Sequence, residues 1–268
     1  MTVDLTQAAA LAAEVREWLR DEKYFHNRVT YHKLAEIAKL LDSKISAFFR
    51  ELNYEEKQQI NNLVTVELLR TGVMKIDNPI QPEVTPATGS CLEPYRWSCY
   101  DGVSTEIEVL EFLHAFVRMI KPKTILETGT YLGHAAVYMA LAQKQNGFGN
   151  LLSCDTDEEV LKRAISLAMQ NDIQMNINFV LRQGCDVISQ MDERSLDLVF
   201  IDSGDEQTRI DEINLVLRKI VPGGFLIVHD IKKLNMVRSH LHYLEHKAVL
   251  NGMCIKCTPR GLGLYQVI

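Results

Sequence analysis

Residues 125–140 read ILETGTYLGHAAVYMA, and this stretch decides the fold. A short apolar run comes first, then Gly129 and Gly133 in the spacing G-x-x-x-G, then a helical pattern. Glycines between a buried strand and a helix are typical of a tight turn whose backbone approaches a nucleotide-like ligand. The stretch therefore predicts a strand, a ligand-binding turn and a helix in succession.

The spacing differs from the G-x-G-x-x-G of dinucleotide-binding turns. Tyr131 stands where a diphosphate site needs glycine. Glu127 would repel a phosphate, but it could accept hydrogen bonds from an ammonium group. A turn that only links strand to helix is the alternative. The residue types favour a ligand with a nucleoside part and a cationic amino acid end.

Strands and helices alternate through the rest of the C-terminal region. Apolar runs predict strands at residues 124–128, 150–155, 177–184, 196–202, 224–230, 253–258 and 261–268, and helical patterns predict helices near 105–120, 133–143, 187–190, 207–220 and 234–247, with another starting at 156. Thr105 with Glu108 and Thr156 with Glu159 predict capping boxes. Short connections predict an α/β, Rossmann-like, doubly wound, mostly parallel seven-stranded sheet whose last strand is antiparallel.

The composition divides the chain into three regions. Residues 1–75 contain about three amphipathic helical patterns and predict a helical cap or a dimerisation region. Residues 76–103 carry four of the seven prolines and predict an extended connector that acts as a substrate lid. Residues 104–268 form the predicted ligand-binding domain.

Charge and composition exclude several classes of function. The chain has 268 residues, 47% of them apolar, and a net charge of −6 without a basic block, so we expect no nucleic-acid or membrane partner. A helix-turn-helix-like pattern at residues 31–53 keeps DNA binding as a weaker alternative, because acids interrupt its basic residues. No apolar run is long enough to span a bilayer. Six scattered cysteines predict reduced thiols and a cytoplasmic location.

Ligands of doubly wound sheets bind beyond the carboxyl ends of the strands. Asp155 follows the second predicted strand and suits ribose hydroxyls. Gly184 and Cys185 follow the third and suit close backbone approach to a flat ring, while Asp186 could accept from an adenine amine or could cap a helix. Asp202 follows the fourth strand.

His229 and Asp230 end the fifth predicted strand, opposite Asp202 in a parallel sheet. Two acids and a histidine that converge at one edge predict a reactive site, because the strands before them are otherwise apolar. His229 is the candidate general base, although a structural histidine is the commoner outcome at a strand end.

Together these motifs resemble the class I S-adenosylmethionine-dependent methyltransferases. LETGTYLGHAAVYMA is similar to the first motif of that family, and SCDTDEE is similar to its ribose-binding motif. VFIDSGDEQTRIDEINLVLRKIVPGGFLIVHD and YDGVSTEIEVLEFLHAFVRMIKPKTILETGT resemble small-molecule O-methyltransferases of the caffeoyl-coenzyme A and catechol type. The resemblance covers residues 90–268.

The resemblance implies methyl transfer from S-adenosylmethionine to a small molecule, with a hydroxyl as the expected acceptor. An N-methyltransferase and a non-catalytic, cofactor-binding regulatory protein are the alternatives. The cofactor-binding residues that it implies are Glu127, Gly129, Thr130, Tyr131, Gly133, His134, Asp155, Gly184, Cys185, Asp186 and Asp202. Tyr95, Trp97 and Tyr100 in the connector are the expected substrate contacts, and residues 1–75 could pair two copies in a homodimer.

The resemblance also raises the question of a metal. Metal-dependent relatives place acids after the fourth and fifth strands and an asparagine directly afterwards. Asp202 and Asp230 match the acids, but Ile231 follows Asp230. Magnesium would need a substitute ligand such as Glu206 or Asp205; without one, His229 would be the base. The sequence does not specify the acceptor.

Overall fold

The computed structural model describes residues 85–86, 98–100, 103–255, 258 and 260–268. The predicted helical region 1–75 lies outside the described residues, as do Tyr95, Trp97 and most of the connector. Within the connector, β1 (Thr85–Pro86) and β2 (Ser98–Cys99) pair in antiparallel fashion. The division of the chain into three regions therefore stays a prediction.

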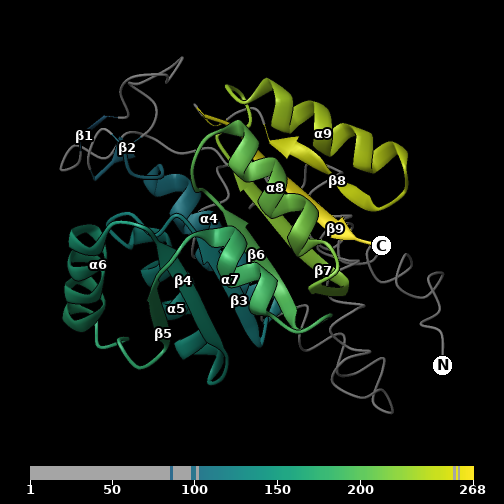
Figure 1. The fold of residues 1–268 in the computed structure, drawn as a ribbon. Coiled ribbons are helices and arrows are strands. Elements are labelled where there is room, and N and C mark those ends of the chain that lie inside the picture. Colours follow the sequence, from purple (N-terminus) through teal and green to yellow (C-terminus); the bar gives the residue numbers. More distant parts are fainter. Residues whose placement is uncertain (1–84, 87–97, 101–102, 256–257, 259) are drawn as a thin grey trace, which may run out of the picture.

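A seven-stranded sheet forms the centre of the domain (Figure 1), and its strand order is β5-β4-β3-β6-β7-β9-β8. Only β9 runs antiparallel to its neighbours, so the predicted doubly wound sheet is confirmed. The strands are β3 (Thr124–Thr128), β4 (Asn150–Asp155), β5 (Ile177–Leu181), β6 (Leu196–Ile201), β7 (Ile220–His229), β8 (Leu250–Ile255) and β9 (Leu262–Val267).

Several strand boundaries differ from the prediction, most of all those of β5, β7 and β8, and β8 begins at Leu250 instead of residue 253. β5 ends at Leu181, so the residues up to Gly184 leave the sheet earlier than expected. β7 begins at Ile220 instead of residue 224, because Ile220 pairs with Leu196 before an irregularity shifts the register. Pro222, Gly223 and Gly224 therefore lie inside β7, at this irregularity, and not in a turn before the strand.

Helices cover both faces of the sheet (Figure 1). α4 (Ile107–Ile120) and α5 (His134–Asn146) share one hydrophobic core with the sheet, and α6 (Glu158–Gln170) packs beside α5. α7 (Gly184–Gln190), α8 (Glu206–Val216) and α9 (Asn235–His246) share a second core on the other face. None of the described helices is long and apolar enough to cross a bilayer.

The side chains of the central strands alternate between these two cores. Ile125 and Phe200 belong to the core under α4 and α5, whereas Leu126, Val199 and Ile201 belong to the core under α7, α8 and α9. All of these side chains are fully buried. Burying one side chain of this size contributes about 1.5–3 kcal/mol relative to leaving it exposed. The near-continuous apolar runs in the sequence therefore correspond to strands covered on both faces.

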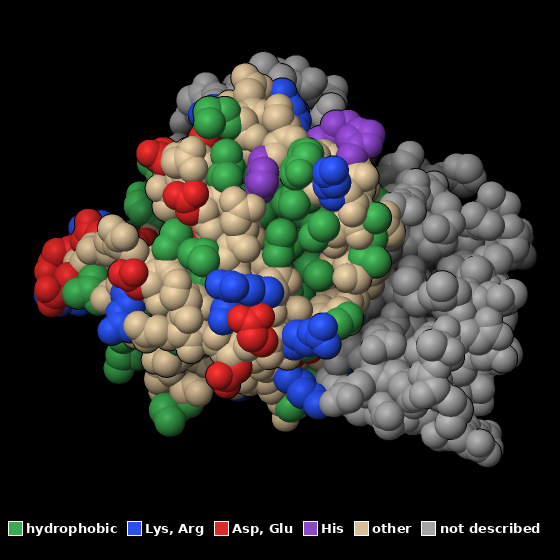
Figure 2. All heavy atoms as spheres, turned by 45° about the vertical axis from the view of Figure 1, so that its right-hand side comes forward, with side chains coloured by type: hydrophobic (Ala, Val, Ile, Leu, Met, Phe, Trp, Pro, Cys, Tyr) green, Lys and Arg blue, Asp and Glu red, His purple; other side chains and the backbone are tan. Residues whose placement is uncertain are grey.

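Charges of both signs are interspersed among the described residues of the face that carries α9, without a continuous basic area (Figure 2). Histidine side chains stand out on the same face. The histidines of α9 are His240, His242 and His246.

Both predicted capping boxes were wrong. The cap of α6 is Asp157, whose side chain accepts hydrogen bonds from the second and third helical N–H groups at 2.9 and 3.2 Å. The cap of α4 is Glu106, which makes no side-chain capping bond. The Thr105 hydroxyl instead donates to Asp202 Oδ2 at 3.1 Å. The Thr105 hydroxyl, which was predicted to cap a helix, therefore binds an acid at the carboxyl edge of the sheet.

The two glycines of the turn after β3 have separate structural reasons. Gly129 has φ of 84°, and a Cβ there would lie 2.5 Å from the Asp202 carbonyl oxygen. Gly133 has φ of 82°, and a Cβ there would lie 2.7 Å from Ala164 Cβ. Gly133 therefore allows the start of α5 to approach α6. The spacing had predicted that this glycine allows the approach to a ligand.

Replacing Gly133 tests this packing. We expect Gly133→Ala to lower the free energy of unfolding by about 2–4 kcal/mol, through the left-handed backbone and the collision with Ala164. Gly147→Ala is the matched control, because Gly147 has φ of 83° but nothing lies within 4 Å of its would-be Cβ. The control should lose only about 1–2 kcal/mol in urea denaturation. Equal losses in the two variants would contradict the packing argument.

Candidate active site

A cavity of about 480 Å³ opens beyond the carboxyl ends of β3, β4 and β6. This volume lies within the usual range for small-molecule sites. The predicted residues that line it are Glu127, Gly129, Thr130, Tyr131, His134, Asp155, Gly184, Cys185, Asp202 and Asp230. Strand ends far apart in the sequence therefore meet around one space, as the doubly wound fold predicts.

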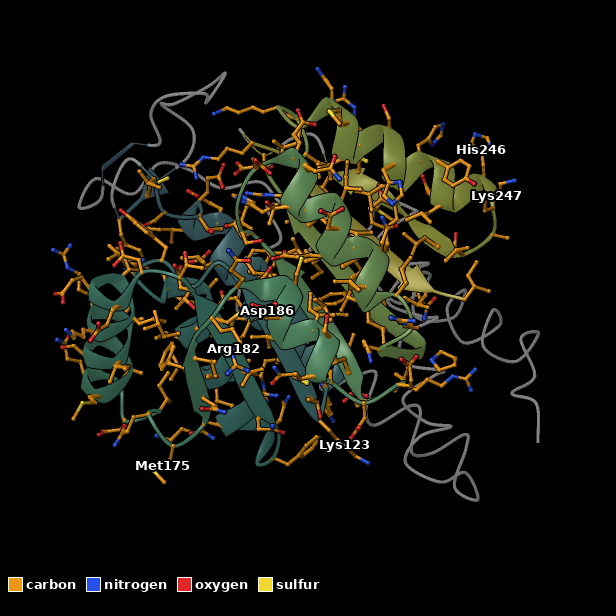
Figure 3. All side chains as sticks on the ribbon, in the orientation of Figure 1. Lys123, Met175, Arg182, Asp186, His246 and Lys247 are labelled. Atoms are coloured by element: carbon orange, nitrogen blue, oxygen red, sulfur yellow. The ribbon has the colours of Figure 1, made fainter. Side chains whose placement is uncertain are left out.

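Asp186 and Tyr100 do not line this cavity. Because α7 begins at Gly184, Cys185 lies on the cavity wall while Asp186 is exposed on the helix (Figure 3). Tyr100 is exposed and stacks on the His134 ring, with 4.3 Å between ring centroids. The Tyr100 hydroxyl lies 2.9 Å from the Tyr138 hydroxyl. Tyr100 therefore borders a cavity residue but not the cavity.

Glu127 is a fully buried carboxyl group at the end of β3. The Ser153 hydroxyl donates to its Oε2, and among the described residues its Oε1 has no hydrogen-bond partner. Burial raises the pKa of Glu127 to about 8; the bond from Ser153 acts in the opposite direction, and the negative charges of Asp202 and Asp155 add to the rise. A positively charged group in the cavity would stabilise its ionised form.

Asp155, at the end of β4, holds two turns together. Its Oδ2 accepts from the Tyr131 backbone N–H at 2.9 Å, and its Oδ1 accepts from the N–H groups of Thr156 and Asp157 at 2.7 and 3.1 Å. Tyr131 has φ of 46°, so the bond to Asp155 fixes an uncommon backbone conformation. Oδ2 accepts only one of these bonds and keeps a second lone pair, so Asp155 can also accept from a ligand hydroxyl.

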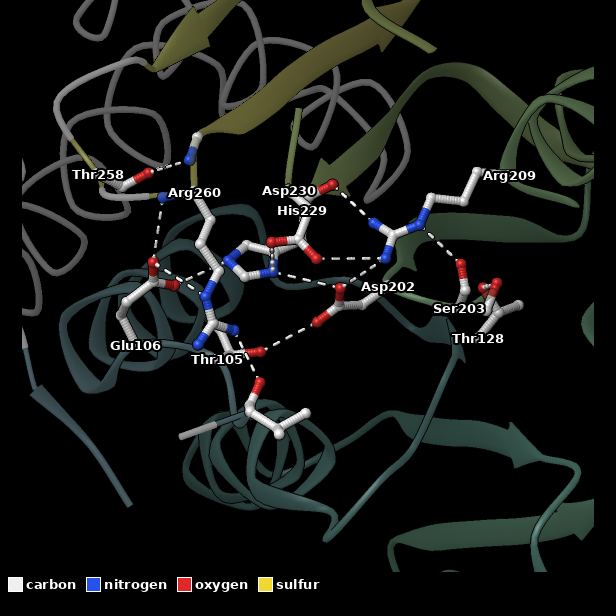
Figure 4. A network of polar contacts seen from close by, with 12 residues as sticks. Thr105, Glu106, Thr128, Asp202, Ser203, Arg209, His229, Asp230, Thr258 and Arg260 are labelled. Carbon is white, nitrogen blue, oxygen red and sulfur yellow. Dashed lines mark hydrogen bonds and ion pairs between the residues drawn. The ribbon is translucent and has the colours of Figure 1, made fainter. Parts of the chain in front are cut away.

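Arg209 of α8 is the centre of a polar network at the edge of the cavity (Figure 4). Its Nη2 lies 3.3 Å from Asp202 Oδ1 and 3.4 Å from Asp230 Oδ2. Its Nε donates to the Ser203 carbonyl and its Nη1 to the His229 carbonyl, both at 2.7 Å. The Arg209 side chain is 5% exposed, so its position is fixed by these four contacts.

His229 lies between two carboxylates of the same network. Its Nε2 is 2.9 Å from Glu106 Oε2 and its Nδ1 is 3.2 Å from Asp202 Oδ1. Burial alone would lower the pKa of His229, but the charges of Asp202 and Glu106 and the bonds to them raise it well above its ordinary value. Both ring nitrogens therefore donate, and the ring is a fixed cation. A general base needs a free lone pair, so this arrangement does not suit the predicted base.

The partners of His229 are ionised. Burial alone would raise the pKa of Glu106, but His229 and Arg260 hold it below its ordinary value. Burial acts in the same direction on Asp202, and His229, Arg209 and the Thr105 hydroxyl hold its pKa low. Arg260 Nε lies 3.9 Å from Glu106 Oε1. With Asp230, three carboxylates therefore face three cations in one buried network.

The predicted metal site does not fit the geometry. Asp202, His229 and Asp230 have ligand atoms within 4.8 Å of one another. A metal-bound histidine must present a deprotonated nitrogen, whereas both nitrogens of His229 bind carboxylates. Arg209 already lies against both acids. Glu206 is not in this group, because its Oε2 accepts from Met236 N at 2.5 Å at the start of α9.

The buried charges of α8 are functional candidates that were not predicted from the sequence. Arg209 and Glu212 are buried on the same face of α8 as Ile213 and Val216. The spacing 209, 212, 213 and 216 is that of one helical face, and charges on an otherwise apolar face are the signal that could have found them. Glu212 lines the cavity and accepts from the hydroxyls of Thr128 and Ser203 at 2.7 and 2.6 Å.

Glu212 leaves no room for a side chain at residue 184. A Cβ at Gly184 would lie 2.0 Å from Glu212 Oε1, an atom that has no hydrogen-bond partner among the described residues. Burial raises the pKa of Glu212 more than the bonds from Ser203 and Thr128 lower it. Gly184 therefore brings a buried carboxyl group close to the wall of the cavity.

Residues 126–231 match a family model described as a methyltransferase domain. A protein of Dictyostelium discoideum named "Probable caffeoyl-CoA O-methyltransferase 2" is 24% identical over 183 residues, which cover 66% of this chain and 74% of that protein. The matched region contains the glycine turn, the acids after β4 and β6, and the end of β7.

Two solved structures share the fold. The O-methyltransferase TomG of Streptomyces achromogenes, which is involved in tomaymycin synthesis and was solved with S-adenosylmethionine, has a TM-score of 0.56 and 14% identity, and the match covers 85% of this chain and 96% of that chain. An O-methyltransferase of Bacillus cereus in complex with S-adenosylhomocysteine has a TM-score of 0.53 and 14% identity, with coverages of 87% and 100%.

These matches confirm the predicted class. Residues 126–231 match a methyltransferase domain, and the fold is shared with O-methyltransferases solved with S-adenosylmethionine or S-adenosylhomocysteine. Among the proteins that it resembles are O-methyltransferases of the caffeoyl-coenzyme A type, as the sequence motifs indicate.

The buried ion pairs predict a stability that depends on pH. The raised pKa of His229 contributes stability below its unfolded value of 6.5, which is lost as pH rises through the folded pKa. The lowered pKa of Glu106 contributes stability above its unfolded value of 4.5, which is lost as pH falls through the folded pKa. Both groups therefore contribute their full stabilisation between pH 4.5 and pH 6.5.

Glu106→Gln tests this network. Near pH 6 we expect the free energy of unfolding to fall by about 3–5 kcal/mol, because the substitution leaves His229 with one carboxylate fewer. Glu159→Gln is the control, since Glu159 pairs with Lys162 at the surface and should change stability by less than about 1 kcal/mol. Urea denaturation measures both. A loss that stays constant from pH 3 to pH 8 would contradict the ionic origin.

Proposed function

We propose that this chain transfers the methyl group of S-adenosylmethionine to a hydroxyl oxygen of a small molecule. The observation that carries the proposal is the cavity at the strand ends, where Glu127 and Asp155 lie on the same wall as the Asp202–Asp230 pair. Glu127 suits a cationic amino acid end, Asp155 suits the hydroxyls of a ribose, and the Asp202–Asp230 pair suits a hydroxyl acceptor. The O-methyltransferase relatives favour the same reaction.

Each part of the cofactor has a proposed partner on this wall. Glu127 accepts from the ammonium group of the amino acid end, and Asp155 accepts from the ribose hydroxyls. Gly184 and Cys185 contact the adenine ring, and they take the place of Asp186, which is exposed away from the cavity. Glu212, beside Gly184, is the nearest buried carboxyl group that could bind the adenine amine.

Asp230 is the proposed base. Its side chain is 24% exposed and lines the cavity, whereas His229 is fully buried and does not. The acceptor oxygen attacks the sulfonium methyl, the carbon–sulfur bond breaks as the carbon–oxygen bond forms, and the hydroxyl proton passes to Asp230. Most of the rate gain comes from holding oxygen, carbon and sulfur in line.

The finer sequence predictions remain proposals. Residues 76–103 are proposed to act as a substrate lid, with Tyr95 and Trp97 as substrate contacts. Residues 1–75 are proposed to form a helical cap or to pair two copies in a homodimer. A cytoplasmic location agrees with the described cysteines, Cys99, Cys154, Cys185 and Cys254, which form no disulfide. An amine acceptor is the alternative that a product analysis distinguishes.

Two measurements test the proposed function. Isothermal titration with S-adenosylmethionine and S-adenosylhomocysteine should show binding, and no heat at millimolar ligand would refute the cofactor site. Incubation with a panel of catechols, other phenols and aliphatic alcohols should then give methylated products by mass spectrometry. Matched amines in the same panel separate oxygen from nitrogen transfer, and products from amines alone would overturn the hydroxyl assignment.

Cofactor binding should release a proton near pH 7. With a pKa of about 8, most Glu127 is protonated before the ammonium group arrives and ionised afterwards. Titration in buffers of different ionisation enthalpy should therefore detect close to one proton, and affinity should rise by about tenfold per pH unit between pH 6 and pH 7. Glu127→Gln should remove both effects, and Glu158→Gln, on the exposed face of α6, should remove neither.

Asp230→Asn should separate chemistry from cofactor binding. The amide keeps the shape of the side chain but cannot take the acceptor proton, so we expect kcat to fall by about 10²–10⁴-fold. The affinity for S-adenosylhomocysteine should change by less than about threefold, because the cofactor binds along the Glu127–Asp155 part of the wall. An unchanged kcat would remove Asp230 from the reaction.

A further inference from the structure

The acid pair at the edge of the cavity already has a cation of its own. The Arg209 guanidinium lies 3.3 Å from Asp202 and 3.4 Å from Asp230 through the same nitrogen. Two backbone carbonyls, of Ser203 and His229, hold the other side of the group. The side chain comes from α8, and the two acids follow β6 and β7.

We propose that Arg209 takes the place of a divalent metal at this site, so that methyl transfer by this chain needs no metal ion. The acids match those of metal-dependent relatives in their position after the fourth and fifth strands. The third oxygen ligand is replaced by Ile231, which is buried and apolar. A guanidinium can neutralise both carboxylates at once, because its N–H groups point in fixed directions.

The charges explain why a metal would be unfavourable here. Glu106, Asp202 and Asp230 are balanced by Arg209, His229 and Arg260. A divalent cation against Asp202 and Asp230 would add two positive charges beside a buried guanidinium and a buried imidazolium. Magnesium is usually held by one or two carboxylates and several waters, but here the Arg209 guanidinium already lies against Asp202 Oδ1 and Asp230 Oδ2.

Arg209 is a positioning residue in this scheme. It holds the carboxylates of Asp202 and Asp230 in place at the cavity and keeps a positive charge there, as a bound metal would. The inference rests on the proposed function for naming this edge as the acceptor side. Metal binding itself can be measured without any acceptor, so the two ideas can fail separately.

The test is titration of the full chain with Mn²⁺, followed by electron paramagnetic resonance of the free ion. Wild type should bind no more Mn²⁺ than Asp230→Asn does. Arg209→Ala exposes the acid pair and should bind Mn²⁺ at least about tenfold more tightly than wild type. Arg209→Lys, which keeps one positive charge, should not gain this binding, and Arg209→Ala with Asp230→Asn should lose it.

Several outcomes decide the matter. Wild-type Mn²⁺ binding that Asp230→Asn abolishes would overturn the proposal, whether or not any Arg209 variant folds. A folded Arg209→Ala chain without a gain in Mn²⁺ binding would also overturn it. If that variant does not fold, Arg209→Gln keeps a donor for the carbonyls of Ser203 and His229 and takes its place in the titration. Once an acceptor is known, EDTA should leave wild-type turnover unchanged, and metal-restored turnover would refute the substitution.

Discussion

The fixed pairing of buried carboxylates with cations is the interaction on which the rest of this domain depends. A sheet whose strands are buried on both faces has few places for charge, and the described acids Glu106, Asp202 and Asp230 lie together where its strands end. An isolated carboxylate there would lose hydration worth several kcal/mol. Arg209, His229 and Arg260 replace that hydration at contact distances of 2.9–3.9 Å. The site is therefore part of the folded core and not an addition to its surface.

This pairing links distant parts of the chain. Glu106 precedes α4, Arg209 belongs to α8, His229 ends β7 and Arg260 precedes β9. All four nevertheless meet in one network of polar contacts (Figure 4). Arg260 also donates to the Val103 carbonyl at 2.7 Å, so the segment before α4 is tied to the last hairpin of the sheet. A substitution in this network would consequently change both stability and the shape of the cavity, which is why matched surface controls are needed to interpret it.

The fold could be predicted from the sequence because each strand and helix carries a local pattern. The apolar runs of β3, β6 and β7 and the glycine turn at residues 129–133 predicted alternating strands and helices and a mostly parallel sheet. The strand ends also placed Glu127, Asp155, Asp202 and Asp230 around one site. The partners of these acids could not be predicted, because Arg209 and Glu212 become neighbours of β6 and β7 only after α8 packs on the sheet. Thr105 shows the same limit, since its local pattern indicates a helix cap and a tertiary contact with Asp202 competes with it.

The acids of the cavity differ in pKa, although all of them carry the same carboxyl group. Asp202 has a lowered pKa because it is paired with His229 and Arg209, whereas Glu127, in the same cavity, has a pKa of about 8 because it is buried and none of the described residues offers it a cation. The charge on Asp202 itself raises the pKa of Glu127. A cationic ligand would thus supply to Glu127 what Arg209 already supplies to Asp202 and Asp230. In the proposed reaction, the methyl donor would bring its ammonium group to the Glu127 end of the cavity, whereas the acid pair already has the positive charge that a metal would bring.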